Sequence, residues 1–140
     1  ADMSGVLDSE QAVIALIQEQ VDAGIPANKI VLAGFSQGGV LSLFTGLRYP
    51  DTLAGILALS CYLPTADCLP ENLSTANKST PILQNHGEQD DVVPMSAGKT
   101  AHDLLVAAGY QTKWKTYRMP HSVLPEQLAD ISQWLQKTLL

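Results

Sequence analysis

The feature that most constrains the fold is a regular alternation of short, continuously apolar runs with longer segments of helical periodicity. Four runs have the length and composition of strands: residues 29–34 (KIVLAG), 54–60 (AGILALS), 81–86 (PILQNH) and 112–117 (TKWKTY). Around them, apolar residues recur at helical spacing, first between Val13 and Val21. Strands that alternate with helices in this way form parallel βαβ units. We therefore predict an α/β fold of about four parallel strands, with helices on both faces of the sheet.

The first and last of these strands differ in how their edges are protected. The strand at 112–117 carries lysines, and charge discourages an edge strand from pairing with another chain. The strand at 29–34 is typical of a central strand with neighbours on both sides, yet only one helix precedes it. We therefore expect one partial domain over residues 1–140, N-terminally truncated, whose missing strands precede residue 1 or come from another chain. The second alternative implies a homodimer or a strand-exchanged oligomer.

The composition excludes several classes of partner. Hydrophobic residues make up 46% and charged residues 16% of the chain, which is enough apolar material for a folded core. The net charge is −6 and the eight Lys and Arg residues are scattered, so we expect no nucleic-acid partner. No apolar stretch is long enough to span a bilayer, and residues 1–10 lack the basic and apolar regions of a signal peptide.

The two cysteines, Cys61 and Cys68, are seven residues apart and match no zinc-binding spacing. We expect free or buried thiols in a reducing compartment, and hence a cytoplasmic protein; a local disulfide is the alternative. We also expect no metal and no cofactor.

A serine flanked by glycines follows the first of the predicted strands. Residues 34–38 read Gly-Phe-Ser-Gln-Gly and match the pattern G-x-S-x-G, with a strand before them and helical periodicity after them. A nucleophilic serine at such a position stands on a tight, strained turn, where side chains two residues before and after it would collide. The following helix directs backbone N–H groups and its positive dipole end at the serine. We therefore predict that Ser36 is a nucleophile; a plain glycine turn is the alternative.

Three histidines are candidates for the general base that a nucleophilic serine needs. His86 ends the third strand, His121 follows the fourth, and His102 falls within a helix. Active sites of open α/β sheets gather at the carboxyl ends of strands, which favours His86 and His121. Only His121 follows the acidic loop after the third strand, as the chain order Ser, Asp, His requires. We therefore predict His121 as the base and His86 as a structural residue of the acid loop, while spacing alone leaves Asp90 and Asp91 open as the acid.

Several segments together carry a family resemblance: AGIP (23–26), GFSQGG (34–39), YLP (62–64), HG with D-x-V-V-P (86–94) and HS (121–122). In this order and spacing they resemble the acyl-protein thioesterase, carboxylesterase and lysophospholipase family of small α/β-hydrolases. The resemblance implies an α/β-hydrolase-like three-layer sandwich. In that family the acid stands three residues after the glycine of HG, which selects Asp90. The resemblance thus implies a triad of Ser36, Asp90 and His121.

The chemistry implied by the resemblance is cleavage of a small-molecule carboxylic ester or thioester through an acyl-enzyme on Ser36. The backbone N–H of Gln37 is the expected oxyanion donor, because it directly follows the nucleophile. Leu63 and Val93, at strand ends, are expected to line the acyl pocket, although core residues there would look the same.

The sequence departs from the family in one respect that bears on activity. The family takes a second oxyanion donor from an HGLG-like segment that this sequence lacks. The chain is then either an active hydrolase that covers its open edge with another chain, or an idle remnant that binds acyl groups or acts as a scaffold. Among activities, a short-chain carboxylesterase is favoured over an acyl-protein thioesterase or lysophospholipase, because no long apolar lid is visible.

Overall fold

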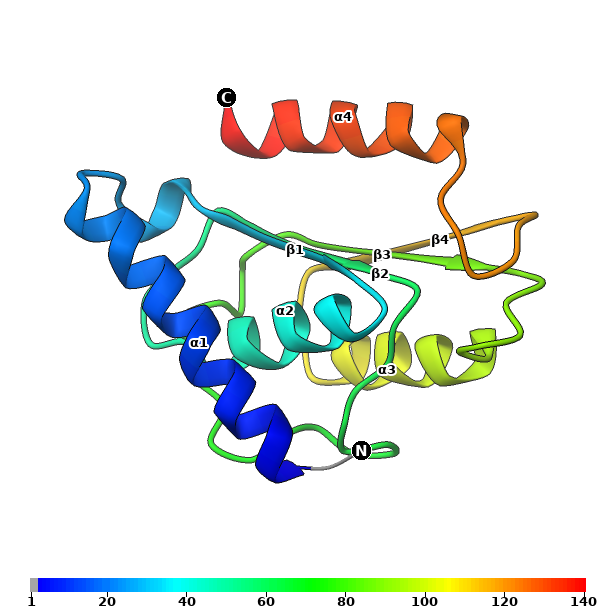
Figure 1. The fold of residues 1–140 in the computed structure, drawn as a ribbon, viewed down its shortest axis with the longest axis horizontal. Helices are drawn as coiled ribbons and strands as arrows, with labels where there is room; N and C mark the ends of the chain where they lie inside the picture. Colours follow the sequence, from blue (N-terminus) through cyan, green and yellow to red (C-terminus); the bar gives the residue numbers. More distant parts are fainter. Residues whose placement is uncertain (1–2) are drawn as a thin grey trace.

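Helices lie on both faces of a four-stranded sheet in the computed structural model, which describes residues 3–140 (Figure 1). The elements in chain order are α1 (Met3–Asp22), the short 3₁₀ helix η1 (Ala27–Lys29), β1 (Val31–Phe35), α2 (Gln37–Arg48), β2 (Gly55–Leu59), β3 (Ile82–Gly87), α3 (Met95–Ala107), β4 (Thr112–Tyr117) and α4 (Pro125–Leu139). The predicted α/β class and the four parallel strands are confirmed. The predicted strands differ from the observed ones by no more than two residues at either end.

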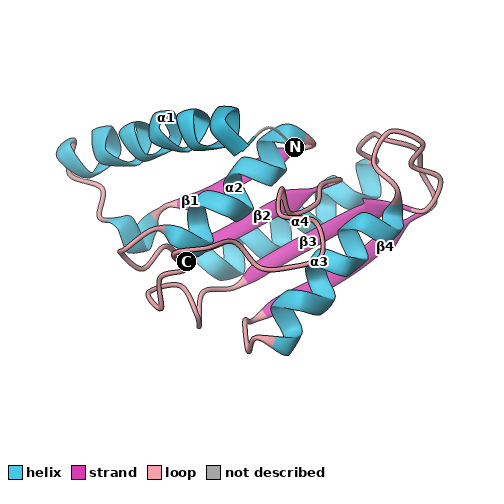
Figure 2. Cartoon of the chain, turned by 90° about the horizontal axis from the view of Figure 1, so that it is seen from below, coloured by secondary structure: helices cyan, strands magenta, loops and turns pink. Residues whose placement is uncertain are grey.

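The strands lie in the order β1-β2-β3-β4, and every neighbouring pair is parallel (Figure 2). Helices α2 and α3 cover one face of the sheet, and α4 covers the other (Figure 1). The register pairs Phe35 with Leu59, Leu59 with Asn85, and Gly87 with Tyr117. All four strands therefore end along one edge of the sheet, and the loops that follow them lie together there.

Most of the apolar core lies between the sheet and the pair α2 and α3. Its fully buried members include Leu43, Leu47, Ile56, Ile82 and Leu105. Burying a side chain of this size stabilises the fold by roughly 1.5–3 kcal/mol. On the other face, a smaller cluster of Leu57, Leu83 and Ile131 joins the sheet to α4.

Helix α1 is held against α2 by a buried ion pair. The Arg48 guanidinium donates from Nε to Glu10 Oε2 at 2.8 Å and from Nη2 to Oε1 at 3.1 Å. Glu10 is only 2% exposed although it lies on an otherwise polar stretch of α1. Because the pair is bidentate, it fixes the orientation of α1 as well as its contact with α2.

The segment 65–80, read from sequence as a polar loop, forms no helix or strand, but it carries a buried side chain that anchors it. Asn77 is 0% exposed. Its Oδ1 accepts from the Leu53 N–H at 2.7 Å and from Thr80 Oγ1 at 2.7 Å, and its Nδ2 donates to the carbonyls of Gly46 and Asp51. One amide group thus ties the loop to the end of α2 and to the segments that lead into β2 and β3.

Both cysteines are free thiols, Cys61 buried and Cys68 exposed, as the first alternative predicted. Burial raises the pKa of the Cys61 thiol to about 12. Cys61 therefore acts as a small apolar core residue rather than as a nucleophile.

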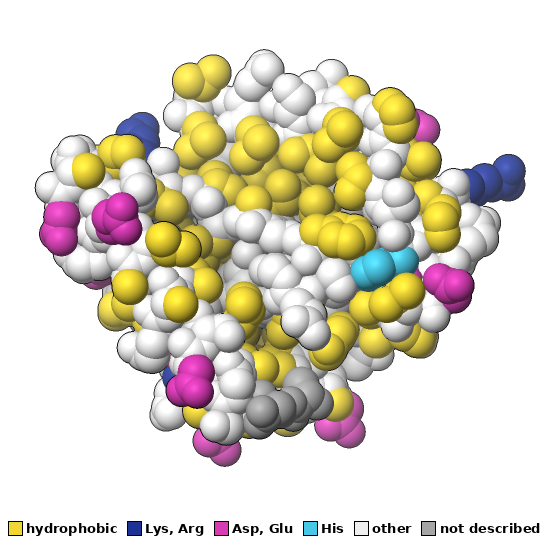
Figure 3. Space-filling model, viewed as in Figure 1, with side chains coloured by type: hydrophobic (Ala, Val, Ile, Leu, Met, Phe, Trp, Pro, Cys, Tyr) yellow, Lys and Arg dark blue, Asp and Glu magenta, His cyan; other side chains and the backbone are white. Residues whose placement is uncertain are grey.

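The two edges of the described sheet differ as the sequence led us to expect. On β4, Lys113 and Lys115 are exposed. On β1 no strand pairs with the outer edge, and an apolar groove of about 330 Å³ runs between α1, β1 and α2, lined among others by Leu16, Val31 and Leu41. Figure 3 shows apolar side chains gathered on this face, beneath α4 and over β1.

Replacing Glu10 by alanine tests the buried ion pair. We expect Glu10→Ala to lower the free energy of unfolding by about 3 kcal/mol, because it leaves the Arg48 charge largely buried without its partner. Asp103→Ala is the matched control, since the Lys99–Asp103 pair on α3 is exposed and is worth less than about 1 kcal/mol. Urea unfolding of the two variants measures the difference, and equal losses would contradict a structural role for the Glu10 pair.

Candidate active site

Ser36 stands on a strained turn between β1 and α2. Its backbone has φ 58° and ψ −120°, a region that residues other than glycine rarely occupy. The Ser36 N–H donates to the Leu59 carbonyl at 2.8 Å, which ties the turn to the end of β2. Although Ser36 is the N-cap residue of α2, its side chain does not cap the helix. The hydroxyl is therefore left to face the loops at the carboxyl edge of the sheet.

Glycine at position 34 permits the close approach of β1 to the start of α2. A Cβ on Gly34 would lie 2.1 Å from the carbonyl carbon and oxygen of Gly38, so any other residue would force the two elements apart. The expectation of a collision at Gly38 is wrong, because outside its neighbours and the backbone of its own helix a Cβ there would meet no described atom within 4 Å. The second tight position is Gly39, where a Cβ would lie 2.9 Å from that of Cys61. The tight contacts thus come from Gly34 and Gly39.

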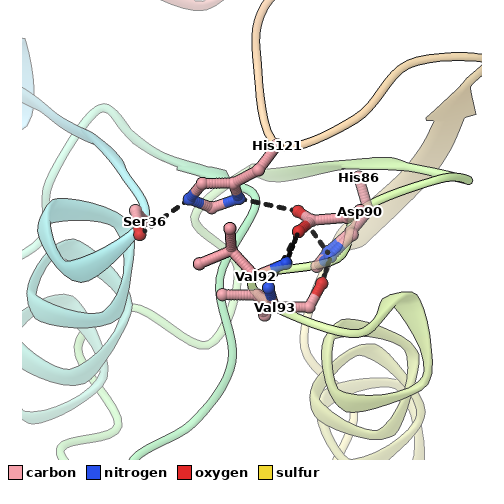
Figure 4. A network of polar contacts seen from close by, with 6 residues as sticks. All are labelled: Ser36, His86, Asp90, Val92, Val93 and His121. Carbon is pink, nitrogen blue, oxygen red and sulfur yellow. Dashed lines mark hydrogen bonds and ion pairs between the residues drawn. The ribbon is translucent and has the colours of Figure 1, made fainter.

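The structure brings Ser36, His121 and Asp90 together in one line (Figure 4). His121 Nδ1 lies 2.7 Å from Asp90 Oδ2, and His121 Nε2 lies 3.0 Å from Ser36 Oγ. An ionised carboxylate only accepts, so Nδ1 carries the proton and Nε2 is free to accept from the serine hydroxyl. This is the tautomer that a general base for Ser36 needs.

The Asp90 carboxylate is held in place by several donors. Its side chain is 0% exposed, and its Oδ1 accepts from the backbone N–H groups of Val92 and Val93 at 2.9 and 2.8 Å. Burial alone would raise the pKa of Asp90, but the hydrogen bonds from His121, Val93 and Val92 outweigh it and lower the pKa. Asp91, which spacing alone could not separate from Asp90, is exposed.

The loop that carries His121 is fixed by a side chain that sequence reasoning missed. Gln127 is 0% exposed; its Oε1 accepts from the Leu124 N–H at 3.2 Å and its Nε2 donates to Asn85 Oδ1 at 3.1 Å. The bond to Leu124 satisfies one of the free N–H groups at the start of α4, and the bond to Asn85 attaches that end to β3. The signal in the sequence is glutamine three residues after the residue that precedes α4.

The other two histidines differ in their relation to this site. His86 lies near the end of β3 and its ring contacts the acid loop, with Nε2 2.8 Å from the Val93 carbonyl and 3.4 Å from Asp90 Oδ2. His102 lies away from it on α3, where its Nδ1 is 3.1 Å from Gln84 Oε1.

The predicted substrate-contacting residues have different surroundings. Gln37 begins α2 and lines a cavity of about 300 Å³ together with Tyr62. Leu63 and Val93 are 1% and 7% exposed, so both belong to the packed interior, and their contact with an acyl group stays a prediction.

Two exposed apolar residues adjoin the triad and escaped the sequence reasoning. Phe35 is 38% exposed, and its ring centroid lies 4.7 Å from that of His121. Val92, in the acid loop beside Asp90, is 64% exposed. Only their positions in the sequence could have indicated them: Phe35 directly precedes Ser36, and Val92 lies two residues after Asp90.

Within residues 3–140, no three His, Cys, Asp or Glu side chains gather into a cluster that could hold a metal ion. No helix in the same range is long and apolar enough to cross a bilayer.

The fold, with these three side chains on the loops at the carboxyl edge of its sheet, is that of the α/β-hydrolases. The family model for phospholipases and carboxylesterases matches residues 1–139, and the chain belongs to that family. Acyl-protein thioesterase 1 of Gibberella zeae is 41% identical over 141 residues, which cover 99% of this chain and 60% of that protein. A protein of Oryza sativa subsp. japonica described as a probable carboxylesterase is 39% identical, over 99% of this chain and 52% of its own length.

Solved structures agree with this assignment. The crystal structure of Arabidopsis thaliana SOBER1 superposes with a TM-score of 0.90 at 33% identity, covering 100% of this chain and 67% of that chain. Zea mays acyl-protein thioesterase 2 gives a TM-score of 0.84 at 27% identity. The chain spans about 60% of the length of the fungal thioesterases it matches.

The lowered pKa of Asp90 predicts how stability depends on pH. In an unfolded chain an aspartate titrates near pH 3.9, so the stabilisation from ionised Asp90 is fully present above about pH 4 and is lost as the pH falls through the lower, folded pKa. We expect the stability gap between the wild type and Asp90→Asn to narrow as the pH falls from about 4 through the lower pKa of folded Asp90. Chemical unfolding across this range measures the gap. A gap that stays constant as the pH falls would contradict the prediction.

Proposed function

We propose that this protein is a serine hydrolase that cleaves carboxylic esters through an acyl-enzyme on Ser36, with His121 as general base and Asp90 as the acid that orients it. The observation that carries the proposal is the continuous line of contacts from Asp90 Oδ2 through both nitrogens of His121 to Ser36 Oγ, at 2.7 and 3.0 Å. Membership in the phospholipase/carboxylesterase family supports the same reaction class.

The reaction follows from the protonation states in that line. Ser36 Oγ attacks the ester carbonyl while its proton passes to His121 Nε2, and the Asp90 carboxylate stabilises the imidazolium that forms. The imidazolium then gives this proton to the departing alcohol, which leaves the acyl group on Ser36. Water, activated by His121, hydrolyses the acyl-enzyme and restores the serine.

The oxyanion that forms during attack needs donors close to Ser36. The backbone N–H of Gln37, the first residue of α2, is our proposed donor, because the first N–H groups of a helix have no partner within the helix. In a well-studied serine protease, one such donor is worth a factor of about 10² to 10³ in kcat.

The surroundings of the triad support an apolar acyl group. Phe35 and Val92 present exposed apolar surface next to His121 and Asp90, and we propose that Leu63 and Val93 line the inner wall of the acyl site. A short-chain carboxylic ester is our leading substrate. Acyl-protein thioesterase or lysophospholipase activity is the second candidate, and the names of the fungal relatives favour the thioester. The third candidate is acyl binding without turnover.

A graded series of p-nitrophenyl esters tests the proposal. We expect the wild type to hydrolyse the short acyl chains fastest, and Ser36→Ala to lower kcat by about 10⁶-fold, as loss of the nucleophile does in a serine protease. Ser132→Ala, at an exposed position on α4, is the control and should retain full activity. Equal binding of the esters by wild type and Ser36→Ala, with turnover by neither, would replace the hydrolase by the acyl-binding alternative.

We also propose that a second copy of the chain covers the open edge of β1 as a homodimer. The unpaired strand edge and the apolar groove beside it support this, because an exposed apolar edge otherwise invites uncontrolled pairing. The free thiols support a reducing, cytoplasmic setting.

Light scattering tests the proposed dimer. We expect a particle of twice the chain mass of 15.0 kDa, and we expect Ala33→Lys, which places a charge on the open edge, to shift the population to the monomer. Ala107→Lys, on the exposed surface of α3, should leave the dimer intact. A well-folded wild-type monomer would exclude the dimer.

A further inference from the structure

We propose that His86 is a positioning residue, whose Nε2–H holds the Asp90 turn in the conformation that presents Asp90 to His121. This role is more than packing beneath the acid loop. Its effect on catalysis rests on the proposed triad, but the contacts of His86 itself can be tested without any substrate.

The first step is the protonation of the His86 ring. Its Nε2 lies 2.8 Å from the Val93 carbonyl oxygen, an atom that can only accept, so Nε2 carries a proton. The other nitrogen, Nδ1, is buried and has no hydrogen-bond partner among the described residues. A proton on Nδ1 would therefore be buried without an acceptor, so His86 is the neutral tautomer with its hydrogen on Nε2.

The second step is the fixed place of the ring. His86 is 0% exposed, and a Cβ on Gly98 of α3 would lie 2.5 Å from His86 Nδ1, so the ring is packed directly against the helix backbone. The Trp114 ring on β4 lies with its centroid 5.9 Å from that of His86. Helix and strand together leave the ring little room to turn, so its Nε2–H points at one place in the acid loop.

The third step links that ring to the triad through Val93. The Val93 carbonyl accepts from His86, while the Val93 N–H donates to Asp90 Oδ1 at 2.8 Å. His86 thus fixes the residue that in turn fixes one oxygen of the carboxylate, and the other oxygen accepts from His121 at 2.7 Å (Figure 4). His86 Nε2 is also 3.4 Å from Asp90 Oδ2, which is too far for a strong hydrogen bond, so the link to the carboxylate runs through Val93.

Replacing His86 by glutamine and by methionine separates this role from simple packing. The two side chains have the same length, but only glutamine carries an N–H donor that can reach the Val93 carbonyl. In proton NMR, the hydrogen between His121 Nδ1 and Asp90 gives a downfield resonance that reports their bond directly. We expect His86→Met to lose this resonance and to slow labelling of Ser36 by a fluorophosphonate at least about tenfold, because the hydrogen bond to Val93 is lost. We expect His86→Gln to show the resonance again and to be labelled within about threefold of the wild-type rate.

His102→Met is the matched control, because His102 also lies beside Trp114, with its centroid 5.7 Å from that ring, but outside the acid loop. It should keep the resonance and the labelling rate. The proposal is overturned if His86→Met retains both signals, or if His86→Gln is folded and as defective as His86→Met. In the folded His86→Met protein, we expect kcat for ester hydrolysis to fall and KM to stay constant, which uniform loosening of the core would not produce.

A measurement on the wild type decides the case even if the methionine variant does not fold. Long-range ¹H–¹⁵N correlation spectra distinguish the two neutral tautomers of histidine and its cation. We expect the tautomer with hydrogen on Nε2 for His86. The neutral tautomer with its hydrogen on Nδ1 would leave Nε2 with nothing to donate to the Val93 carbonyl and would overturn the proposal. Because the spectra need no substrate, the two proposals fail separately. Absence of esterase activity would contradict the proposed function, but the tautomer of His86 could still be measured.

Discussion

The whole site depends on how closely β1 approaches the start of α2. At Gly34 the strand lies against the carbonyl of Gly38 at a distance that no side chain could share. This contact makes the turn tight enough to hold Ser36 at φ 58°. Ser36 is the N-cap residue of α2, but its hydroxyl makes no capping hydrogen bond and stays free of the helix. Strain of this kind persists only where packing on all sides maintains it. Here β2 contributes by accepting the Ser36 N–H, and the Cys61 side chain fits against Gly39.

The parallel register then brings chemistry from distant parts of the chain to one edge. Ser36 follows β1, Asp90 follows β3 and His121 follows β4; β3 and β4 end in register with each other, and β1 ends two residues earlier. The sheet alone does not aim the side chains, however. Two buried polar residues do so: Gln127 attaches the His121 loop to β3, and His86 ties down the turn that bears Asp90. Each uses a side chain to satisfy backbone groups that no strand or helix could reach.

The strands and helices could be predicted well because each is indicated by a local pattern of residues. Short apolar runs between helical segments identified every strand to within two residues, and chain order pointed to His121 rather than His86 as the partner of a serine. The choice of Asp90 over Asp91 came from family resemblance; in the structure it is Asp90 whose carboxylate lies 2.7 Å from His121 Nδ1. By contrast, the burial of Gln127 and Asn77 could not be predicted. A glutamine at that position of α4 indicates a helix cap, but the partners that bury the two side chains lie up to forty-two residues away. The prediction for Gly38 was wrong for the same reason. A motif shows that a glycine is present, but not which atoms a larger side chain at that position would meet.

The position of Asn77 separates two properties of this protein. Its amide joins the segments that lead into β2 and β3, so it lies at the amino ends of the strands, whereas the triad lies at their carboxyl ends. Between Pro64 and Asn77 the chain is also tied to α2, because the Glu71 carbonyl accepts from Arg48 Nη1 at 2.7 Å and the Ser74 N–H donates to the Leu47 carbonyl at 3.0 Å. A change at Asn77 would therefore alter stability through the amino ends of the strands, far from the side chains that form the triad at their carboxyl ends.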